Sequence, residues 1–150
     1  MRIHLGGSSR QSLVIARGKL DAAVKGASAA TASEISTHLF FAAEVFASNT
    51  SLRRAITDPS RDIAAKKALI ADLFGTKIGK EASTLISDIA ALRWSATKDV
   101  IYVLEQLAIE AEASAANIAG ELDRVEDEIF TAAAAFASST ELRKALTSDA

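Results

Sequence analysis

Apolar residues recur at every third or fourth position along most of this chain, which is the spacing of one face of an α-helix. The pattern predicts successive helices over about 10–25, 31–47, 51–56, 59–74, 80–93, 98–119 and 121–138. No window alternates apolar and polar residues over more than a few positions, as a half-buried strand does. We therefore expect an all-α protein.

Polar residues and glycines between these segments predict where the helices begin and end. Ser9 is the expected cap of the first helix, after a flexible lead over 1–9, and Gly26 is the expected break behind that helix. Thr50 is placed to cap the short third helix. Asp58–Pro59 suits the start of the fourth helix, because aspartate caps well and proline fits the first turn. Gly75 is expected to end it.

One stretch of the chain occurs twice. From Phe40 to Thr57, eleven of eighteen residues are identical to those 90 positions later, and Phe46 corresponds to Phe136. So long a separation is typical of a duplicated small domain, because solenoid repeats recur every 20–50 residues or so. We expect a six-helix-type bundle over 10–103, followed by a long helix and the start of a second, duplicated helical unit over 104–150. Phe46 and Phe136 should then lie in like environments.

Composition narrows the function classes. Apolar residues make up 49% of the 150 positions but aromatic residues only 5%, because alanine dominates, and small side chains let helices pack closely. The formal net charge of −2 argues against a nucleic-acid surface, which needs a basic face. The absence of cysteine excludes disulfides and thiol chemistry, and no stretch approaches the ~18 apolar residues of a membrane span. We expect a soluble protein that is not exported.

Few side chains are arranged for catalysis or ligand binding. Gly75–Lys80 looks faintly like a phosphate-binding loop, but its second glycine comes one residue early and Glu81 replaces the magnesium-binding Ser/Thr. Glu34 and His38 lie one helical turn apart, yet a carboxylate di-metal bundle needs a second such pair. We therefore expect no enzyme activity, no catalytic residues, no cofactor and no metal. Trp94, the only tryptophan, either closes the core or anchors an interface.

Several segments resemble the delta subunit of the rotary F-type ATP synthase, known in mitochondria as the oligomycin-sensitivity-conferring protein, and most closely its longer actinobacterial form. These segments are Ser8–Leu13, Leu52–Arg61 (LRRAITDPSR), Ala65–Lys77 (AKKALIADLFGTK), Arg93–Ser95, Leu104–Ala111 and Gly120–Phe130 (GELDRVEDEIF). Together they span most of the chain, and their order and spacing carry the resemblance. It implies a non-catalytic component of the peripheral stalk, the stator, during proton-driven ATP synthesis.

The resemblance also implies two partners. The family's N-terminal six-helix bundle grips N-terminal helices of the alpha subunits, and a separate C-terminal domain joins subunit b of the stalk. An alpha-subunit helix would lie in a groove between the first and fifth helices, 10–25 and 80–93. The residues expected in this contact are Leu13, Arg17, Leu20, Ile86, Ile89 and Arg93. The apolar members of this set fit a buried core equally well, so both interpretations stay open.

The same resemblance implies that the chain is an N-terminal fragment of a longer protein. Contact with subunit b would then be made by the C-terminal parts of that longer protein, which are absent here. Four apolar residues of the second copy would then lack their usual partners, namely Phe130, Phe136, Leu142 and Leu146. We expect them to pack against the first bundle, to mediate self-association, or to fray. The implied location is cytoplasmic, on the cytoplasmic face of the plasma membrane, with no nucleic acid or small-molecule substrate. The alternative function is a generic helical protein-interaction or ligand-sensing bundle.

Overall fold

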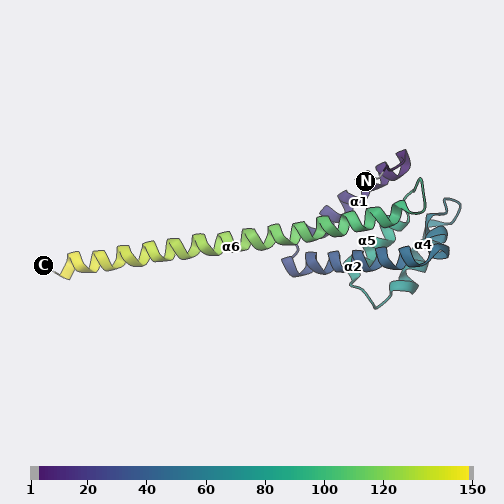
Figure 1. The fold of residues 1–150 in the computed structure, drawn as a ribbon. Coiled ribbons are helices and arrows are strands. Elements are labelled where there is room, and N and C mark those ends of the chain that lie inside the picture. The colour runs from purple at the N-terminus through teal and green to yellow at the C-terminus, as the bar shows by residue number, and fades with distance from the viewer. Residues whose placement is uncertain (1–3, 149–150) are drawn as a thin grey trace. The chain divides into compact units, whose positions relative to one another are not determined.

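The computed structural model describes residues 4–148, with side chains for 4–139 and 144, and it confirms the all-α fold (Figure 1). Its helices are α1 (Gly7–Val24), α2 (Ala29–Ser48), α3 (Thr50–Thr57), α4 (Ile63–Phe74), α5 (Lys80–Ala90) and α6 (Asp99–Ser148). The described part of the chain contains no strand. None of these helices, within residues 4–148, combines the length and the apolar character that crossing a membrane requires.

The chain divides into two units, Met1–Ala115 and Ala116–Ala150. The first unit holds α1 to α5 and the beginning of α6, and it contains the hydrophobic core. The second unit consists of the remainder of α6.

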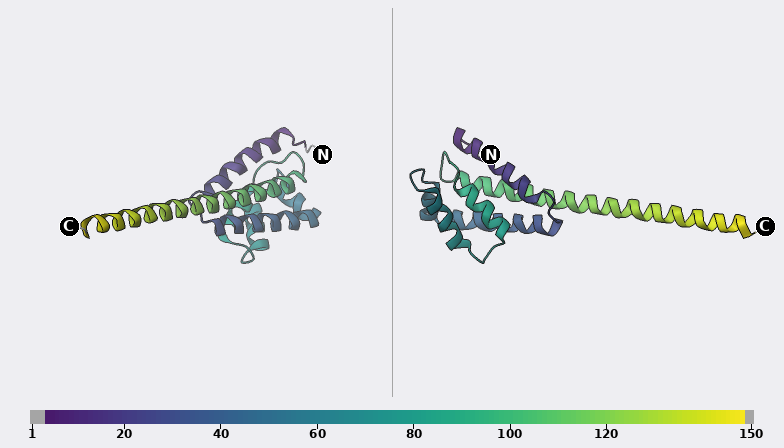
Figure 2. Two further views of the ribbon diagram at one scale, coloured as in Figure 1. Left: turned by 60° about the vertical axis from the view of Figure 1, so that its left-hand side comes forward. Right: turned by 180° about the vertical axis from the view of Figure 1, so that it is seen from behind.

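The core of the first unit is built around α2 and the start of α6, which lie side by side (Figure 2). Residues buried at helical spacing on α2 include Ile35, Leu39 and Phe46. The buried stripe of α6 holds Val100, Val103, Leu104, Leu107, Ala108 and Ala111. Alanine at the contact lets the backbones approach, so that the Ser36 hydroxyl donates to the Ala108 carbonyl at 2.6 Å. Burial of each large apolar side chain stabilises the fold by ~1.5–3 kcal/mol.

A buried polar network fastens the start of α1 to the turn between α5 and α6. The Ser9 hydroxyl donates to the Asp99 carboxylate at 2.7 Å and accepts from the Ser95 backbone N–H at 2.7 Å. The Ser12 hydroxyl donates to the Arg93 carbonyl one turn further along α1. Because Ser9 and Asp99 are both buried, these bonds fix the position of α1 beside the end of α5.

Several predicted helix ends are confirmed and others are wrong. The breaks at Gly26 and Gly75 are confirmed, and both glycines have a positive φ that other residues rarely adopt. The cap predicted at Ser9 is wrong, because α1 already begins at Gly7 and Ser9 lies buried within it. Helix α2 also begins earlier than predicted, because the Ser28 side chain accepts from the Thr31 N–H.

The caps predicted for α3 and α4 are also wrong. Asn49, not Thr50, caps α3, since its side-chain oxygen accepts from the Leu52 N–H at 3.0 Å. The Asp58 carboxylate accepts instead from the backbone N–H and the hydroxyl of Ser60, which closes a local turn. As a result α4 begins at Ile63, four residues after the predicted start at proline.

The helix breaks predicted for the second copy are absent, since α6 continues through Gly120 and through the predicted stop at Ser138. The first copy breaks after Ser48 because Asn49 caps α3 and because Leu52 and Ile56 become buried there. The second copy has Ser139 in place of that asparagine.

The predicted likeness of Phe46 and Phe136 is also wrong. Phe46 is 0% exposed in the core, whereas Phe136 is 76% exposed on the second unit. The sequence repeat therefore does not produce the same packing in the part of the chain that the structure describes.

Candidate protein-interaction groove

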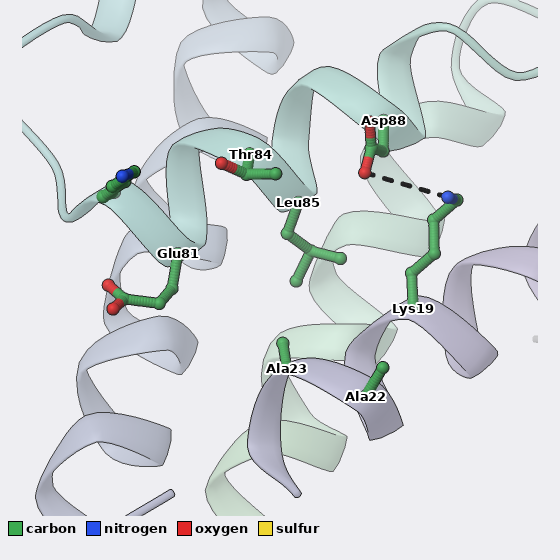
Figure 3. Close-up of a pocket in the computed structure, with 8 residues that line it drawn as sticks. Lys19, Ala22, Ala23, Glu81, Thr84, Leu85 and Asp88 are labelled. Atoms are coloured by element: carbon green, nitrogen blue, oxygen red, sulfur yellow. Dashed lines mark ion pairs between the residues drawn. The ribbon is translucent and has the colours of Figure 1, made fainter.

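A groove of about 550 Å³ lies between α1 and α5, the two helices that the sequence predicts to form a contact site. It is lined by Lys19, Ala22 and Ala23 from α1 and by Lys80, Glu81, Thr84, Leu85 and Asp88 from α5. Figure 3 shows Leu85 projecting from α5 toward α1, on the side where the methyl groups of Ala22 and Ala23 lie. The small α1 residues leave the groove open, and Leu85, a core residue that is only 3% exposed, closes its floor.

Charged side chains form the rim of this groove. The Lys19 ammonium lies 3.7 Å from one oxygen of Asp88 (Figure 3). The Lys67 ammonium of α4 lies 3.2 Å from the other oxygen. Both lysine side chains are more than two-fifths exposed, so each pair contributes less than ~1 kcal/mol. A partner could therefore displace Lys19 from Asp88 at little cost.

A second cavity, of about 320 Å³, lies nearer the beginning of α1 and shares no lining residue with the groove. It is lined by Ser8, Gln11, Ser12, Ile15, Ala91, Leu92 and Arg93. The α1 residues of the two cavities follow one another at intervals of three or four, so they share one face of that helix. Ile15 is about half exposed on this face. One face of α1 thus borders both the groove and the second cavity.

The six predicted contact residues do not form one surface. Leu20, Ile86 and Ile89 are buried in the core, and Leu13 packs against that core. The Arg17 guanidinium pairs with Glu110 of α6 at 2.8 Å.

None of the six lines the groove between α1 and α5, and only Arg93 lines the second cavity. The family resemblance predicted the correct pair of helices, α1 and α5. The lining residues were missed because alanine and threonine give a weak hydrophobic signal, while the larger residues beside them turn inward.

The phosphate-loop-like segment and the Glu34–His38 pair both take part in local structure. The phosphate-loop-like segment is the turn between two helices, in which Gly75 ends α4 and Gly79 precedes α5. The His38 Nδ1 atom accepts from the Gly79 N–H at 3.2 Å, and Glu34 lies beside the same glycine. Within residues 4–148, no three His, Asp or Glu side chains are grouped so that they could hold a metal ion.

The residues predicted for self-association lie on the second unit. Phe130 and Phe136 are largely exposed there. The side chains of Leu142 and Leu146 fall outside those that the structure describes. Self-association through these residues stays a prediction. Trp94 is half-buried against the core, in the turn predicted between α5 and α6.

An apolar groove between two helices, with charges of both signs at its rim, is typical of a helical protein-interaction unit. Comparison with known proteins shows which family of such proteins the chain is related to. No family model matches the chain. It is 39% identical to ATP synthase subunit delta of Streptomyces coelicolor over 142 residues, which are 95% of this chain and 52% of that protein. The proteins of the same name from Parafrankia sp. and Salinispora arenicola are 38% and 35% identical over 96% and 95% of this chain, which cover 54% and 52% of their own lengths.

The chain thus spans about half the length of the curated relatives it matches. It is homologous to ATP synthase subunit delta, which confirms the predicted resemblance to the actinobacterial proteins of that family.

Proposed function

We propose that this chain is a non-catalytic component of the peripheral stalk of an F-type ATP synthase, which holds the alpha subunits still during proton-driven ATP synthesis. The observation that supports this most is the groove between α1 and α5 in a chain homologous to subunit delta. A generic ligand-sensing bundle is less well supported, because the groove is a surface channel between helices and the relatives share one name.

The groove would take an amphipathic helix from the N-terminus of an alpha subunit. Apolar side chains of that helix would lie over Leu85 and against Ala22 and Ala23, whose methyl groups allow the two backbones to approach. Lys19 and Asp88 would flank the bound helix with opposite charges, which favours one orientation of a helix that carries both signs.

A stator works by resisting torque, so both walls of the groove have to stay in place under load. The buried hydrogen bonds from Ser9 to Asp99 and to Ser95 hold the start of α1 beside the α5–α6 turn. The pair between Arg17 and Glu110 joins the middle of α1 to α6. These contacts oppose spreading of the groove, and the buried ones contribute most of that resistance.

The proposed location is peripheral, at the cytoplasmic face of the membrane that holds the complex. We propose that subunit b is contacted by the part of the longer relatives to which this chain does not align. The relatives extend well beyond the matched residues, which cover 52% of the Streptomyces coelicolor protein.

The groove is tested with a fluorescent peptide that copies the alpha-subunit N-terminus of the same complex. The wild-type chain should bind it, and Ala22→Glu should weaken binding at least tenfold, because a carboxylate would lie over the apolar floor. Ala68→Glu is the matched control, since Ala68 is exposed on α4 and lines neither the groove nor the second cavity. Circular dichroism checks that both variants keep their helicity. Absence of binding by the wild type, or equal binding by Ala22→Glu, contradicts the proposal.

A further inference from the structure

A third cavity, of about 330 Å³, lies where three connections of the first unit meet. It is lined by Ser8, Thr57, Pro59, Arg61, Ile63, Lys66, Ala91, Leu92, Arg93 and Trp94. These residues come from the start of α1, from the α3–α4 turn with the start of α4, and from the α5–α6 turn. The cavity shares four residues with the second cavity but adds a lining of its own.

The lining of this cavity carries three cations and no carboxylate. Arg61, Lys66 and Arg93 all line it. Lys66 is 4% exposed, which is unusual for a lysine, and its ammonium makes no hydrogen bond or ion pair with any described residue. Asp58 attracts this ammonium from a distance, but its carboxylate is held by two hydrogen bonds from Ser60. The Nζ atom is not among the fully buried polar atoms, so the ammonium stays accessible, and a bound anion would give it the charged partner that it lacks.

Trp94 and the starts of two helices line the same space. The indole Nε1–H of Trp94 is buried and has no acceptor among the described residues. The cavity also reaches the first turns of two helices, at Ser8 of α1 and Ile63 of α4. Asp62 does not accept from the first turn of α4, whereas in the first turn of α1 the Ser95 Oγ atom already accepts from the Ser9 N–H at 3.2 Å. The uncapped first turn of α4 presents backbone N–H groups and the positive end of the helix dipole to an anion.

From the lysine, the two arginines and the first turn of α4 that line it, we propose that this cavity binds a tetrahedral oxyanion of the phosphate type. A dianion matches three cations better than a single carboxylate does, and guanidinium groups bind phosphate oxygens in a two-pronged geometry. The volume holds one phosphate with some water, since each water occupies ~30 Å³. Free phosphate and the phosphoryl group of a small ester share this chemistry.

The single tryptophan gives a direct readout, because Trp94 lines the cavity. The wild-type protein is titrated with inorganic phosphate, and separately with glycerol 3-phosphate, at constant ionic strength against sodium chloride and acetate. We expect a saturable change in tryptophan fluorescence and a rise in the unfolding midpoint with at least one phosphate compound. Tighter binding of the ester would identify a phosphoryl group as the ligand, and tighter binding of phosphate would identify the free ion. An equal response to chloride or acetate overturns the proposal.

Two variants locate the site. Lys66→Met keeps the length of the buried side chain but removes its charge, and it should weaken phosphate binding at least tenfold. Lys77→Met is the matched control, because Lys77 is exposed and lines none of the cavities. If Lys66→Met does not fold, Arg61→Gln takes its place, since Arg61 is exposed and lines the same cavity. Unchanged binding in whichever of these two variants is folded overturns the proposal.

Discussion

Replacing Phe46 by alanine should cost more stability than almost any other single change in this chain. Phe46 is 0% exposed, and its ring meets Phe74 edge to face at 6.0 Å and 76°. Truncating a buried phenylalanine costs ~3–5 kcal/mol through lost burial and the cavity left behind. The aromatic pair accounts for ~0.5–1.5 kcal/mol of that. At ~4 °C per kcal/mol for a unit of this size, the midpoint should fall by roughly 12–20 °C.

The matched control is Phe130→Ala, because Phe130 is 76% exposed on α6. Alanine has a higher helix propensity, so this variant should stay within ~0.5 kcal/mol of the wild type or gain slightly. Urea titrations followed by circular dichroism give both values, provided that the slopes agree. A loss under ~1 kcal/mol for Phe46→Ala, or an equal loss for both variants, would refute the packing described for the first unit.

Three further predictions concern polar groups. Burial lowers the pKa of Lys66, so the folded protein binds fewer protons than the unfolded chain between that lowered value and about 10.4. Unfolding free energy should therefore rise with pH through this window, and Lys66→Met should flatten the rise in urea titrations at several pH values. Ser9→Ala should cost ~1.5–3 kcal/mol, because it removes a hydrogen bond to the buried Asp99 carboxylate, and a thermal melt unchanged from wild type would contradict this. Asn49→Ala should cost ~0.5–2 kcal/mol through loss of the α3 cap, whereas Thr50→Ala should cost less if asparagine is the cap.

Much of the fold could be predicted from the sequence, because helical periodicity and glycine breaks depend on local chemistry. The stripes that contain Leu39 and Phe46 on α2 and Leu104 and Leu107 on α6 are buried as their spacing predicts. Cap positions were less predictable, since several polar residues stand side by side at each helix start. Asn49 and Thr50 are adjacent, and only the backbone conformation decides which side chain reaches the first turn.

The second copy shows why a repeat does not fix packing. Phe136 repeats Phe46 in the sequence, but its burial depends on helices that would have to cover it. A break after Ser138 would interrupt backbone hydrogen bonds of the helix. In the first unit, the burial of Leu52 and Ile56 compensates for the corresponding loss. When the helix continues, its backbone hydrogen bonds are kept. A glycine within the helix, such as Gly120, lowers its stability by only ~1 kcal/mol relative to alanine.

The candidate site could be predicted as a pair of helices but not as a set of residues. Large apolar residues such as Ile86 and Ile89 carry the sequence signal, and they face the core. The groove is formed where side chains are small, at Ala22 and Ala23, and by a leucine whose burial resembles that of any core residue. Only the three-dimensional packing distinguishes residues that line the groove from residues that face the core.

The most direct test of the central claim is a site-specific cross-link in an ATP synthase complex that contains this protein. The chain has no cysteine, so Ala22→Cys introduces a single attachment point in the groove for a short photoactivated cross-linker. Ala68→Cys on the exposed side of α4 serves as the control. The account predicts an adduct with the alpha subunit from position 22 and none from position 68. Equal alpha-subunit adducts from both positions, or none from position 22, would contradict it.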